Sequence, residues 1–374
     1  MAGVRFWWAV IGALIGRQAL ASPMYTVIDL QPAGYTKSDA VGISGGQQIG
    51  YVSGAPIGGQ FHAALWSGSP ANFVDLNPSG FISTFGQGIA GGQEVGNGFG
   101  PATGGDTHAL LWFGSTAGVI DLAPPGFALT TANGTDGANQ AGYGELAGAP
   151  GVDHALKWSG TSASAVDLNP SGYTMSRASA IANGQVVGLG YPESDVAHAH
   201  ALIWTGGGNT ATDLNPIAFD FSQAKGTDGP QQVGGGYGAA TNGHDHALLW
   251  SGTAASFIDL NPLGFQSSDA VGVSNGQQVG EGVLTSTGKQ HALLWYGGAD
   301  DYIDLQSYLP SYFTESAALF VDGQGNISGH ALDMLDGQNH AVVWLVPEPS
   351  LANFVVALMG LWFCRRSIRR TPFT

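Results

Sequence analysis

The sequence predicts an all-β fold, a seven-bladed β-propeller with four strands in each blade. A cleavable signal peptide precedes the propeller, and a sorting segment with a short transmembrane helix follows it. Glycine supplies 60 of the 374 residues, apolar residues 44% and charged residues only 10%, which excludes a disordered chain and disfavours a helical bundle. His-Ala-x-x-Trp and Asp-Leu each recur seven times. Each copy also divides into four short strand-like runs.

Residues 1–21 are expected to form a secretory signal peptide. Arg5 provides a charged start, an apolar run extends from Phe6 to Ile15, and Ala19-Leu20-Ala21 fits a small-x-small cleavage site before Ser22. A retained anchor helix is the alternative. It is less favoured, because the apolar run is shorter than the ~20 residues that a membrane span needs.

The body, from Tyr25 to Trp344, is one unit repeated seven times. Successive His-Ala-x-x-Trp motifs lie 45 to 49 residues apart, and successive Asp-Leu motifs lie 45 or 46 apart. A period this regular indicates a repeat architecture with no separate domain between copies. The repeated residues are the histidines His62, His108, His154, His200, His246, His291 and His340, the tryptophans Trp66, Trp112, Trp158, Trp204, Trp250, Trp295 and Trp344, and the aspartates Asp29, Asp75, Asp121, Asp167, Asp213, Asp259 and Asp304.

The sixth copy shows how four strands fit into one repeat. We predict strands at 257–260, 269–273, 277–280 and 291–295, with a tight hairpin turn at Asn275-Gly276. Asn-Gly favours such a turn because both central residues need positive φ. Four strands in ~46 residues match a propeller blade and exceed a β-helix coil.

The order of the strands predicts how the ring closes. Two hairpins place the glycine-rich strand innermost, then the Gln-Gln-Val strand, the His-Ala-x-x-Trp strand and, outermost, the Asp-Leu strand. The chain begins with an unpaired Asp-Leu strand at 27–30 and ends with an unpaired His-Ala-x-x-Trp strand at 340–344. Pairing of these two segments would complete a shared blade.

Residues 346–370 are expected to form a sorting signal. Pro347-Glu348-Pro349 leads into an apolar stretch at 351–364, which is followed by Arg365, Arg366, Arg369 and Arg370. By the positive-inside rule the arginines stay in the cytoplasm. A 14-residue helix spans ~21 Å, short of the ~30 Å hydrocarbon core. The segment therefore suits a transient inner-membrane intermediate better than a permanent anchor.

This succession of Pro-Glu-Pro, short apolar helix and arginine cluster resembles the PEP-CTERM sorting signal of exopolysaccharide-producing Gram-negative bacteria. The resemblance covers Val346 to Arg370, and residues 371–374 run slightly past the usual basic end. It implies that an exosortase-type processing enzyme recognises the tail. The mature protein would then be at the cell surface or extracellular, with a link to exopolysaccharide or the biofilm matrix.

The repeat itself resembles the HAF family of bacterial extracellular repeats. The third motif position is Ala, Leu or Val and never Phe, so the resemblance depends on His-Ala, Trp, Asp-Leu and the period. It implies an extracellular propeller-like domain and carries no catalytic residue.

Charge limits the partners of the body. Between the two terminal segments there are five Lys and Arg against 26 Asp and Glu, a net charge of −21. Such a surface repels nucleic acid and anionic membranes, and leaves neutral polymers, cations and basic partners as ligands. The single cysteine, Cys364, lies in the tail, so the body has no disulfide.

The repeated His and Asp residues are expected to be structural, since a residue present once in every blade indicates architecture rather than one active site. Three histidines fall outside the pattern: His198, His244 and His330. His198 and His244 lie 46 residues apart, and each would share a strand face with the histidine two residues on if the strand extends that far. We predict no metal site, and these two residues are the ones to consider first.

Acidic glycine turns at 133–137, 226–229 and 322–326 offer oxygen ligands for Ca²⁺. None matches an EF-hand or a Gly-Gly-x-Gly-x-Asp repeat, and turn chemistry explains them equally well. No cofactor is predicted, and Ca²⁺ remains open.

No catalytic motif is evident. Glu94, Glu145, Glu193, Glu281 and Glu315 are scattered in register, and there is no nucleophile elbow, zinc-protease motif or phosphate loop. We therefore expect a non-catalytic binding or scaffold module that contacts an extracellular polysaccharide or a surface protein. The alternative is a propeller-fold carbohydrate-active or hydrolytic enzyme. A binding module predicts variation confined to loops such as 144–153, 190–199 and 235–245 along one rim, whereas an enzyme predicts off-repeat acids and bases gathered at the axial mouth.

Overall fold

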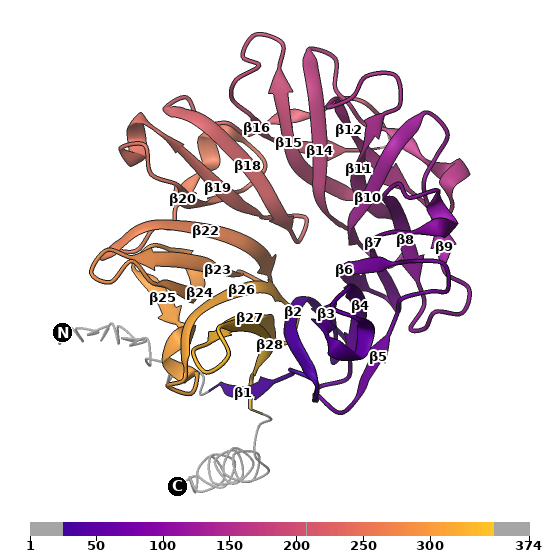
Figure 1. Cartoon of the computed structure of the whole chain (residues 1–374). Helices are drawn as coiled ribbons and strands as arrows, with labels where there is room; N and C mark the ends of the chain where they lie inside the picture. The colour runs from indigo at the N-terminus through magenta and orange to yellow at the C-terminus, as the bar shows by residue number, and fades with distance from the viewer. Residues whose placement is uncertain (1–24, 207, 348–374) are drawn as a thin grey trace, which may run out of the picture.

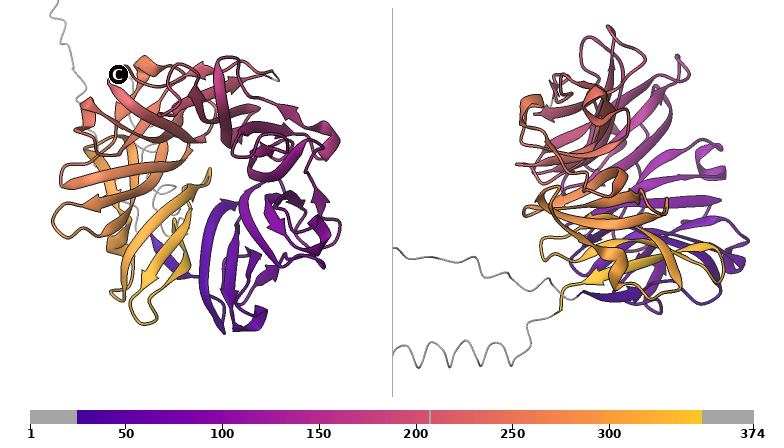
Figure 2. Two further views of the ribbon diagram at one scale, coloured as in Figure 1. Left: turned by 45° about the horizontal axis from the view of Figure 1, so that its top comes forward. Right: turned by 90° about the vertical axis from the view of Figure 1, so that its left-hand side faces the viewer.

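The computed structural model describes residues 25–206 and 208–347. These residues form seven four-stranded antiparallel sheets arranged around one axis (Figures 1 and 2), which confirms the predicted seven-bladed β-propeller. Within the described ranges, no helix is long and apolar enough to cross a membrane. The predicted signal peptide at 1–21 and the predicted helix at 351–364 lie outside the described residues.

Each blade takes its strands from consecutive parts of the chain. Blade 1 contains β2 (Tyr35–Ser44), β3 (Gln47–Gly54), β4 (Phe61–Trp66) and β5 (Phe73–Asp75). Blades 2 and 3 contain β6 (Ser83–Ala90), β7 (Gln93–Phe99), β8 (His108–Trp112) and β9 (Ile120–Asp121), then β10 (Phe127–Thr135), β11 (Gln140–Leu146), β12 (Asp153–Trp158) and β13 (Val166–Asp167). Blades 4 and 5 contain β14 (Tyr173–Ala182), β15 (Gln185–Pro192), β16 (His200–Thr205) and β17 (Thr212–Asp213), then β18 (Phe219–Thr227), β19 (Gln232–Gly238), β20 (His246–Trp250) and β21 (Ile258–Asp259). Blade 6 contains β22 (Phe265–Ser274), β23 (Gln277–Leu284), β24 (Gln290–Gly298) and β25 (Asp301–Asp304).

Blade 7 closes the ring as predicted. Its strands are β26 (Phe313–Val321), β27 (Ile327–Asp333), β28 (Gln338–Leu345) and, outermost, β1 (Thr26–Asp29). The N-terminal strand therefore lies beside the C-terminal one (Figure 1), with Val27 paired with Trp344. The predicted strand order within the blades, with the glycine-rich strand innermost, is also confirmed.

Strand lengths differ from the prediction in the sixth copy. The inner strand β22 covers ten residues rather than five, and the outer strand β21 only two. The outer strand is short because Pro262 follows it closely and cannot donate to a ladder. The predicted tight turn is confirmed, since Asn275 and Gly276 have φ of 51° and 78°.

The hydrophobic core lies between neighbouring blades. All seven repeated tryptophans are fully buried. Trp204 of blade 4, for example, belongs to one buried cluster with Leu168, which follows the outer strand of blade 3, and Ala141 of the same blade. Each blade therefore needs its neighbour to cover its apolar face, which is why closure of the ring matters for stability.

Candidate functional site

The repeated histidines and aspartates meet in pairs on adjacent strands. In each pair, the histidine Nδ1 lies 2.6 to 3.1 Å from an aspartate Oδ2. The pairs are His62–Asp75, His108–Asp121, His154–Asp167, His200–Asp213, His246–Asp259, His291–Asp304 and His340–Asp29. The two repeated polar residues therefore pair across neighbouring strands in all seven blades.

A longer hydrogen-bond circuit, which sequence reasoning missed, continues into the next blade from five of the seven aspartates: Asp29, Asp75, Asp167, Asp213 and Asp304. The Asp75 Oδ1 accepts the Asn77 N–H at 2.8 Å, and the Asn77 Oδ1 accepts the Thr84 hydroxyl at 3.0 Å. The Thr84 Oγ1 in turn accepts the backbone N–H of Ala63, at 2.9 Å, from the preceding blade. The Asp-Leu-Asn-Pro segment therefore holds two blades together, and its carboxylate is committed to that task.

The closing pair carries one additional carboxylate. His340 Nδ1 lies 3.1 Å from Asp29, and its Nε2 lies 3.1 Å from Asp336 Oδ2. Ligand atoms of Asp333, Asp336 and His340 fall within 4.8 Å of one another, so these three could hold a metal ion. A protonated imidazole between two carboxylates accounts for the same geometry without an ion. Burial acts to lower the pKa of His340, but its hydrogen bonds to Asp29 and Asp336 prevail and raise it to about 9.

This contact predicts a pH dependence of stability. Because the folded pKa of His340 lies above its ordinary value of 6.5, the stabilisation is complete below pH ~6.5 and is lost as the pH rises through ~9. Asp336→Asn should reduce this loss by about 1 to 2 kcal/mol, measured as the free energy of unfolding at pH 6 and pH 10. The same change in the free energy of unfolding between pH 6 and pH 10 in the wild type and in Asp336→Asn would contradict this prediction.

His198 and His244 do not form the metal site considered from sequence. β16 begins at His200 and β20 at His246, so His198 and His244 precede the strands and share no strand face with the next histidine. His198 Nδ1 instead contacts Asp195 at 3.0 Å, within its own loop. Within residues 25–206 and 208–347, neither belongs to a group of three possible ligands.

The acidic glycine turns use their carboxylates within the turn. Asp136 Oδ1 accepts the N–H groups of Ala138 and Asn139, and Asp322 Oδ1 accepts those of Gln324 and Asn326. Asp228 Oδ1 likewise accepts the Gln231 N–H at 2.9 Å. Turn chemistry, one of the two explanations that the sequence leaves open, accounts for these Oδ1 contacts. Asp136 Oδ2 in addition accepts the Gly184 N–H of the next blade at 3.1 Å.

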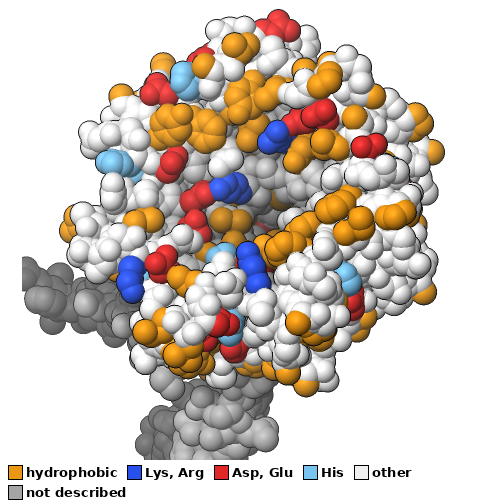
Figure 3. All heavy atoms as spheres, viewed as in Figure 1, with side chains coloured by type: hydrophobic (Ala, Val, Ile, Leu, Met, Phe, Trp, Pro, Cys, Tyr) orange, Lys and Arg blue, Asp and Glu red, His pale blue; other side chains and the backbone are white. Residues whose placement is uncertain are grey.

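Charged residues outside the repeat gather near the mouth of the ring. Each blade places one variable pair at the same register of its first two strands: Asp39–Tyr51, Phe85–Asn97, Thr131–Tyr143, Arg177–Leu189, Gln223–Gly235, Asp269–Glu281 and Ala317–His330. Figure 3 shows Lys and Arg side chains next to Asp and Glu around a hollow on this face. Variation is therefore not confined to loops, contrary to what a binding module predicts, and the off-repeat acids and bases at the mouth are the pattern that an enzyme predicts.

Opposite charges join blade 5 to blade 6 and, separately, blade 7 to blade 1. Lys225 of blade 5 forms an ion pair with Asp269 of blade 6. In blade 7, His330 Nδ1 lies 2.8 Å from Asp39 of blade 1, whose other carboxylate oxygen is 3.7 Å from Lys37. Separately, Arg177 Nε donates to Asp153 at 2.6 Å between blades 4 and 3. Three of the five basic residues of the body therefore lie in these contacts.

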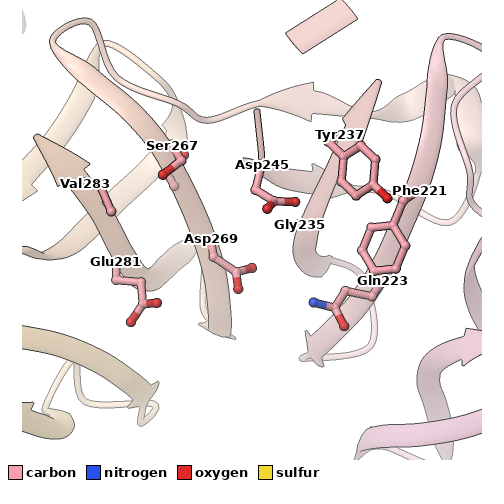
Figure 4. A pocket seen from close by; sticks show the side chains of 11 residues that line it. Phe221, Gln223, Gly235, Tyr237, Asp245, Ser267, Asp269, Glu281 and Val283 are labelled. Carbon is pink, nitrogen blue, oxygen red and sulfur yellow. The ribbon is translucent and has the colours of Figure 1, made fainter. Parts of the chain in front are cut away.

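A pocket of about 410 Å³ lies between blades 5 and 6. The Phe221 and Tyr237 rings stack with centroids 5.2 Å apart and form one wall (Figure 4). Asp269 and Glu281 lie on the opposite side, with Asp245 between the walls. Asp245 belongs to the loop between β19 and β20. Loops between the second and third strands lie at the same end of every blade, because the strands are antiparallel.

Burial changes the acidity of two of these carboxyl groups. Burial raises the pKa of Asp269, and Asp245 adds to this effect while Lys225 opposes it. Burial also raises the pKa of Glu281, to which Asp269 contributes. Glu281 accepts a hydrogen bond of 2.6 Å from Gln290. Among the described residues, the buried Asp269 Oδ1 has no hydrogen-bond partner, so a strong acceptor is left unsatisfied beside the pocket.

A single glycine opens this pocket. Gly235 occupies the second-strand position at which the other six blades carry a side chain. A Cβ on Gly235 would lie 2.8 Å from Asp269 Oδ1. The missing side chain therefore leaves the space that the carboxylate faces.

The remaining glutamates do not join this site. Glu94 takes the place of the glutamines that bind the turn after the third strand, and accepts the Gly114 N–H at 2.6 Å. Glu145, Glu193 and Glu315 are not among the residues that line the pocket. Of the five glutamates considered from the sequence, all of them described by the structure, Glu281 alone lines the pocket. Sequence reasoning missed its partners because Asp269 and Asp245 become neighbours only when the repeats are aligned position by position and assembled into a ring.

A second hollow of about 600 Å³ follows the axis of the ring. All seven inner strands line it, mainly with small and apolar residues, and Lys225 is its one basic lining residue. Lys225 thus lies between the axial hollow and the acidic pocket.

The comparisons with known proteins reveal similarity of fold. No protein-family model matches the chain, and the comparison with curated protein sequences found no match. The β-propeller domain of the Trilobed protease from Pyrococcus furiosus superposes with a TM-score of 0.54 at 9% identity, over 83% of this chain and 94% of that chain. That domain is described as having an open velcro topology, whereas β1 and β28 pair here.

Two enzymes also share the architecture. An oligogalacturonate lyase from Vibrio parahaemolyticus has a TM-score of 0.52 at 9% identity and covers 86% of this chain and 92% of its own. A puromycin-hydrolyzing peptidase from Mycobacterium tuberculosis has a TM-score of 0.52 at 12% identity; the match covers 84% of this chain and 54% of the peptidase. At such identities the similarities establish a β-propeller fold and nothing about the reaction.

Proposed function

We propose that this protein is an exported propeller that binds carbohydrate at the pocket between blades 5 and 6 and acts as a non-catalytic binding or scaffold module of the extracellular matrix. One observation carries the proposal: an aromatic wall of Phe221 and Tyr237 faces hydrogen-bonding carboxylates across an open pocket. Sugar rings present apolar C–H faces and polar edges, which such a pocket matches on its two sides.

Other features support a carbohydrate more than a protein or a nucleic acid. The pocket is a hollow rather than a flat apolar face, and its polar lining includes the Gln223 amide and the Ser267 hydroxyl. The net charge of −21 in the body disfavours a polyanion. An extracellular polysaccharide is thus the favoured partner, and a surface protein is the second.

Binding to a glycan array and titration calorimetry with recombinant residues 22–345 test the proposal. Phe221→Ala and Tyr237→Ala should each weaken binding of the best glycan by at least about tenfold, because each removes stacking area. Phe320→Ala, which changes an exposed aromatic residue (38% exposed), is the control and should leave the affinity within about twofold. Unchanged affinity in both pocket variants would contradict the assignment of the site.

The terminal segments support export. The secretory signal at 1–21 and the PEP-CTERM-like tail at 346–370 together favour a Gram-negative host, an inner-membrane intermediate and processing by an exosortase-type enzyme. Intact mass of protein purified from the native host tests this part. Persistence of Arg365 to Arg370 there would argue against processing, whereas persistence in a host without the enzyme would not.

A glycoside-cleaving activity is the second candidate. It is favoured by the gathering of Asp245, Asp269 and Glu281, two of which have raised pKa values, the arrangement from which glycosidases draw a general acid. Prolonged incubation with the bound glycan, followed by measurement of new reducing ends, separates the candidates. If the wild-type protein generates new reducing ends and Glu281→Gln does not, catalysis rather than binding is the function.

A further inference from the structure

We propose that the pocket between blades 5 and 6 selects a cationic ligand, namely a sugar bearing a free amino group such as a de-N-acetylated hexosamine polymer. This inference rests on the proposed carbohydrate-binding function and specifies the ligand class. It depends on the imbalance of charge in the pocket, on one unsatisfied oxygen, and on the space that Gly235 leaves.

The pocket contains more negative charge than its surroundings neutralise. Asp245, Asp269 and Glu281 contribute three carboxyl groups. Lys225 is paired with Asp269 through Oδ2, and His330 and Lys225 both lie near enough to Glu281 to oppose the rise in its pKa. Asp269 and Glu281 are adjacent partners in the β22–β23 ladder, so their charges lie close together. A ligand with a positive group would relieve this repulsion, whereas a carboxylated sugar would increase it.

The position for the positive group is defined by hydrogen-bonding capacity. Asp269 Oδ1 is buried and, within residues 25–206 and 208–347, has no donor within hydrogen-bond distance. Lys225 occupies the other oxygen of the same carboxylate. An ammonium group supplies up to three donors, and a charged donor to a carboxylate forms one of the stronger protein hydrogen bonds. An N-acetyl group at the same place offers one neutral donor and adds bulk.

The space for this group is specific to one blade pair. Gly235 lies beside Asp269 Oδ1 with no side chain between them. At the equivalent location in blade 1, Asp39 also sits in a first strand, but there His330 and Lys37 both contact the carboxylate. We call Asp39 the matched site, because two basic side chains lie beside its carboxylate, although Asp39 Oδ2, like Asp269 Oδ1, has no hydrogen-bond partner among the described residues.

The aromatic wall fixes the rest of the sugar. With the amino group at Asp269, the ring lies between the carboxylates and the stacked Phe221 and Tyr237, as the arrangement in Figure 4 indicates. The pocket has room for one or two sugar units at about 410 Å³. Longer polymers would extend over the rim.

The test compares three oligosaccharides of equal length by titration calorimetry at pH 6.5: a glucosamine oligomer, its N-acetylated form and a neutral glucose oligomer. We expect the glucosamine oligomer to bind at least about tenfold more tightly than the other two. Asp269→Asn should weaken its binding by at least about tenfold and leave the affinity for the N-acetylated form within about twofold. Asp39→Asn, at the matched site, should change neither.

Gly235→Leu provides an independent test that removes no charge. Blade 4 carries Leu189 at this position. In blade 5 the new Cβ would lie 2.8 Å from Asp269 Oδ1, so the carboxylate has to turn aside and the leucine side chain would fill the space beside it. Binding of the glucosamine oligomer should be abolished while the melting temperature stays close to that of the wild type. Retained binding in this variant would overturn the assigned position.

The outcomes separate the two proposals. Equal affinity for the amino and N-acetylated oligomers would overturn the selection of a cation and leave carbohydrate binding intact. Failure of all three to bind, together with a blank glycan array, would overturn both. Binding of the glucosamine oligomer that persists unchanged in Asp269→Asn and Gly235→Leu would show nonspecific attraction to the acidic surface and would also overturn the inference.

Discussion

Replacing Gly188 by alanine should lower the free energy of unfolding by more than about 3 kcal/mol, although only one methyl group is added. Gly188 lies in β15, opposite Ala178 of the inner strand, where a bulge interrupts the ladder. A Cβ on Gly188 would lie 2.0 Å from the Arg177 carbonyl oxygen and 2.9 Å from Ala178 Cα. Both are backbone atoms within a sheet, so neither can move aside without breaking the pairing of the two strands.

The same constraint recurs in every blade. The equivalent glycines would each place a Cβ 1.8 to 2.0 Å from a carbonyl oxygen of the inner strand; they are Gly50, Gly96, Gly142, Gly188, Gly234, Gly280 and Gly329. Each lies opposite a register shift of its inner strand. The glycine content of the chain is thus partly a requirement of the bulged inner hairpin, which bends each blade as it approaches the axis.

Gly148→Ala is the matched control. This glycine lies in the exposed loop between β11 and β12, and a Cβ there would meet nothing within 4 Å. Urea unfolding of both variants should show a change within about 0.5 kcal/mol for Gly148→Ala. A similarly small change for Gly188→Ala would mean that the hairpin relaxes and that the bulge does not require glycine.

Most of the fold could be predicted from the sequence because the information is repeated. Seven copies of one spacing fix the number of blades, and the incomplete copies at the two ends identify the strands that close the ring, as the pairing of Val27 with Trp344 confirms. Strand lengths were less accurate, since the length of β22 depends on packing at the axis rather than on its own residues.

The pocket could not be predicted in the same way. Repetition hides it, because the residues that form it are the ones that depart from the repeat: Gly235, Asp269 and Glu281 each look unremarkable within their own copy. Their proximity results from the angle between neighbouring blades and from the absence of a side chain at Gly235. A comparison of the seven copies at this one register position would have identified Gly235, Asp269 and Glu281 as departures from the repeat.

Loop histidines illustrate the opposite error. His198 and His244 attracted attention because they break the pattern, but their strands begin two residues later and no further ligand reaches them within the described ranges. A departure from a repeat therefore indicates a site only where it falls on a position that faces a shared space between blades.

Removal of a repeated tryptophan should destabilise the ring about as much as the glycine replacement. Trp204 is fully buried between blades 3 and 4, and its Nε1–H donates to the Leu168 carbonyl at 2.8 Å. Trp204→Ala should cost about 3 to 5 kcal/mol, from lost burial and the cavity left behind. Val196→Ala, at a residue with 63% exposure, is the control and should change the free energy of unfolding by less than about 0.5 kcal/mol.

Phenylalanine substitutions separate the packing of the indole from its hydrogen bond. Trp158 occupies the equivalent position in blade 3 and is equally buried, but its Nε1 has no hydrogen-bond partner in the part of the chain that the structure describes. Trp204→Phe should therefore cost about 1 kcal/mol more than Trp158→Phe, because only the former leaves a buried carbonyl without its donor. Urea unfolding of Trp204→Ala, Val196→Ala, Trp204→Phe and Trp158→Phe measures the cost of losing the buried indole and the cost of losing its hydrogen bond. A cost below about 1 kcal/mol for Trp204→Ala would place that side chain outside the interblade core, and equal costs for the two phenylalanine variants would show that the Leu168 bond contributes no net stability.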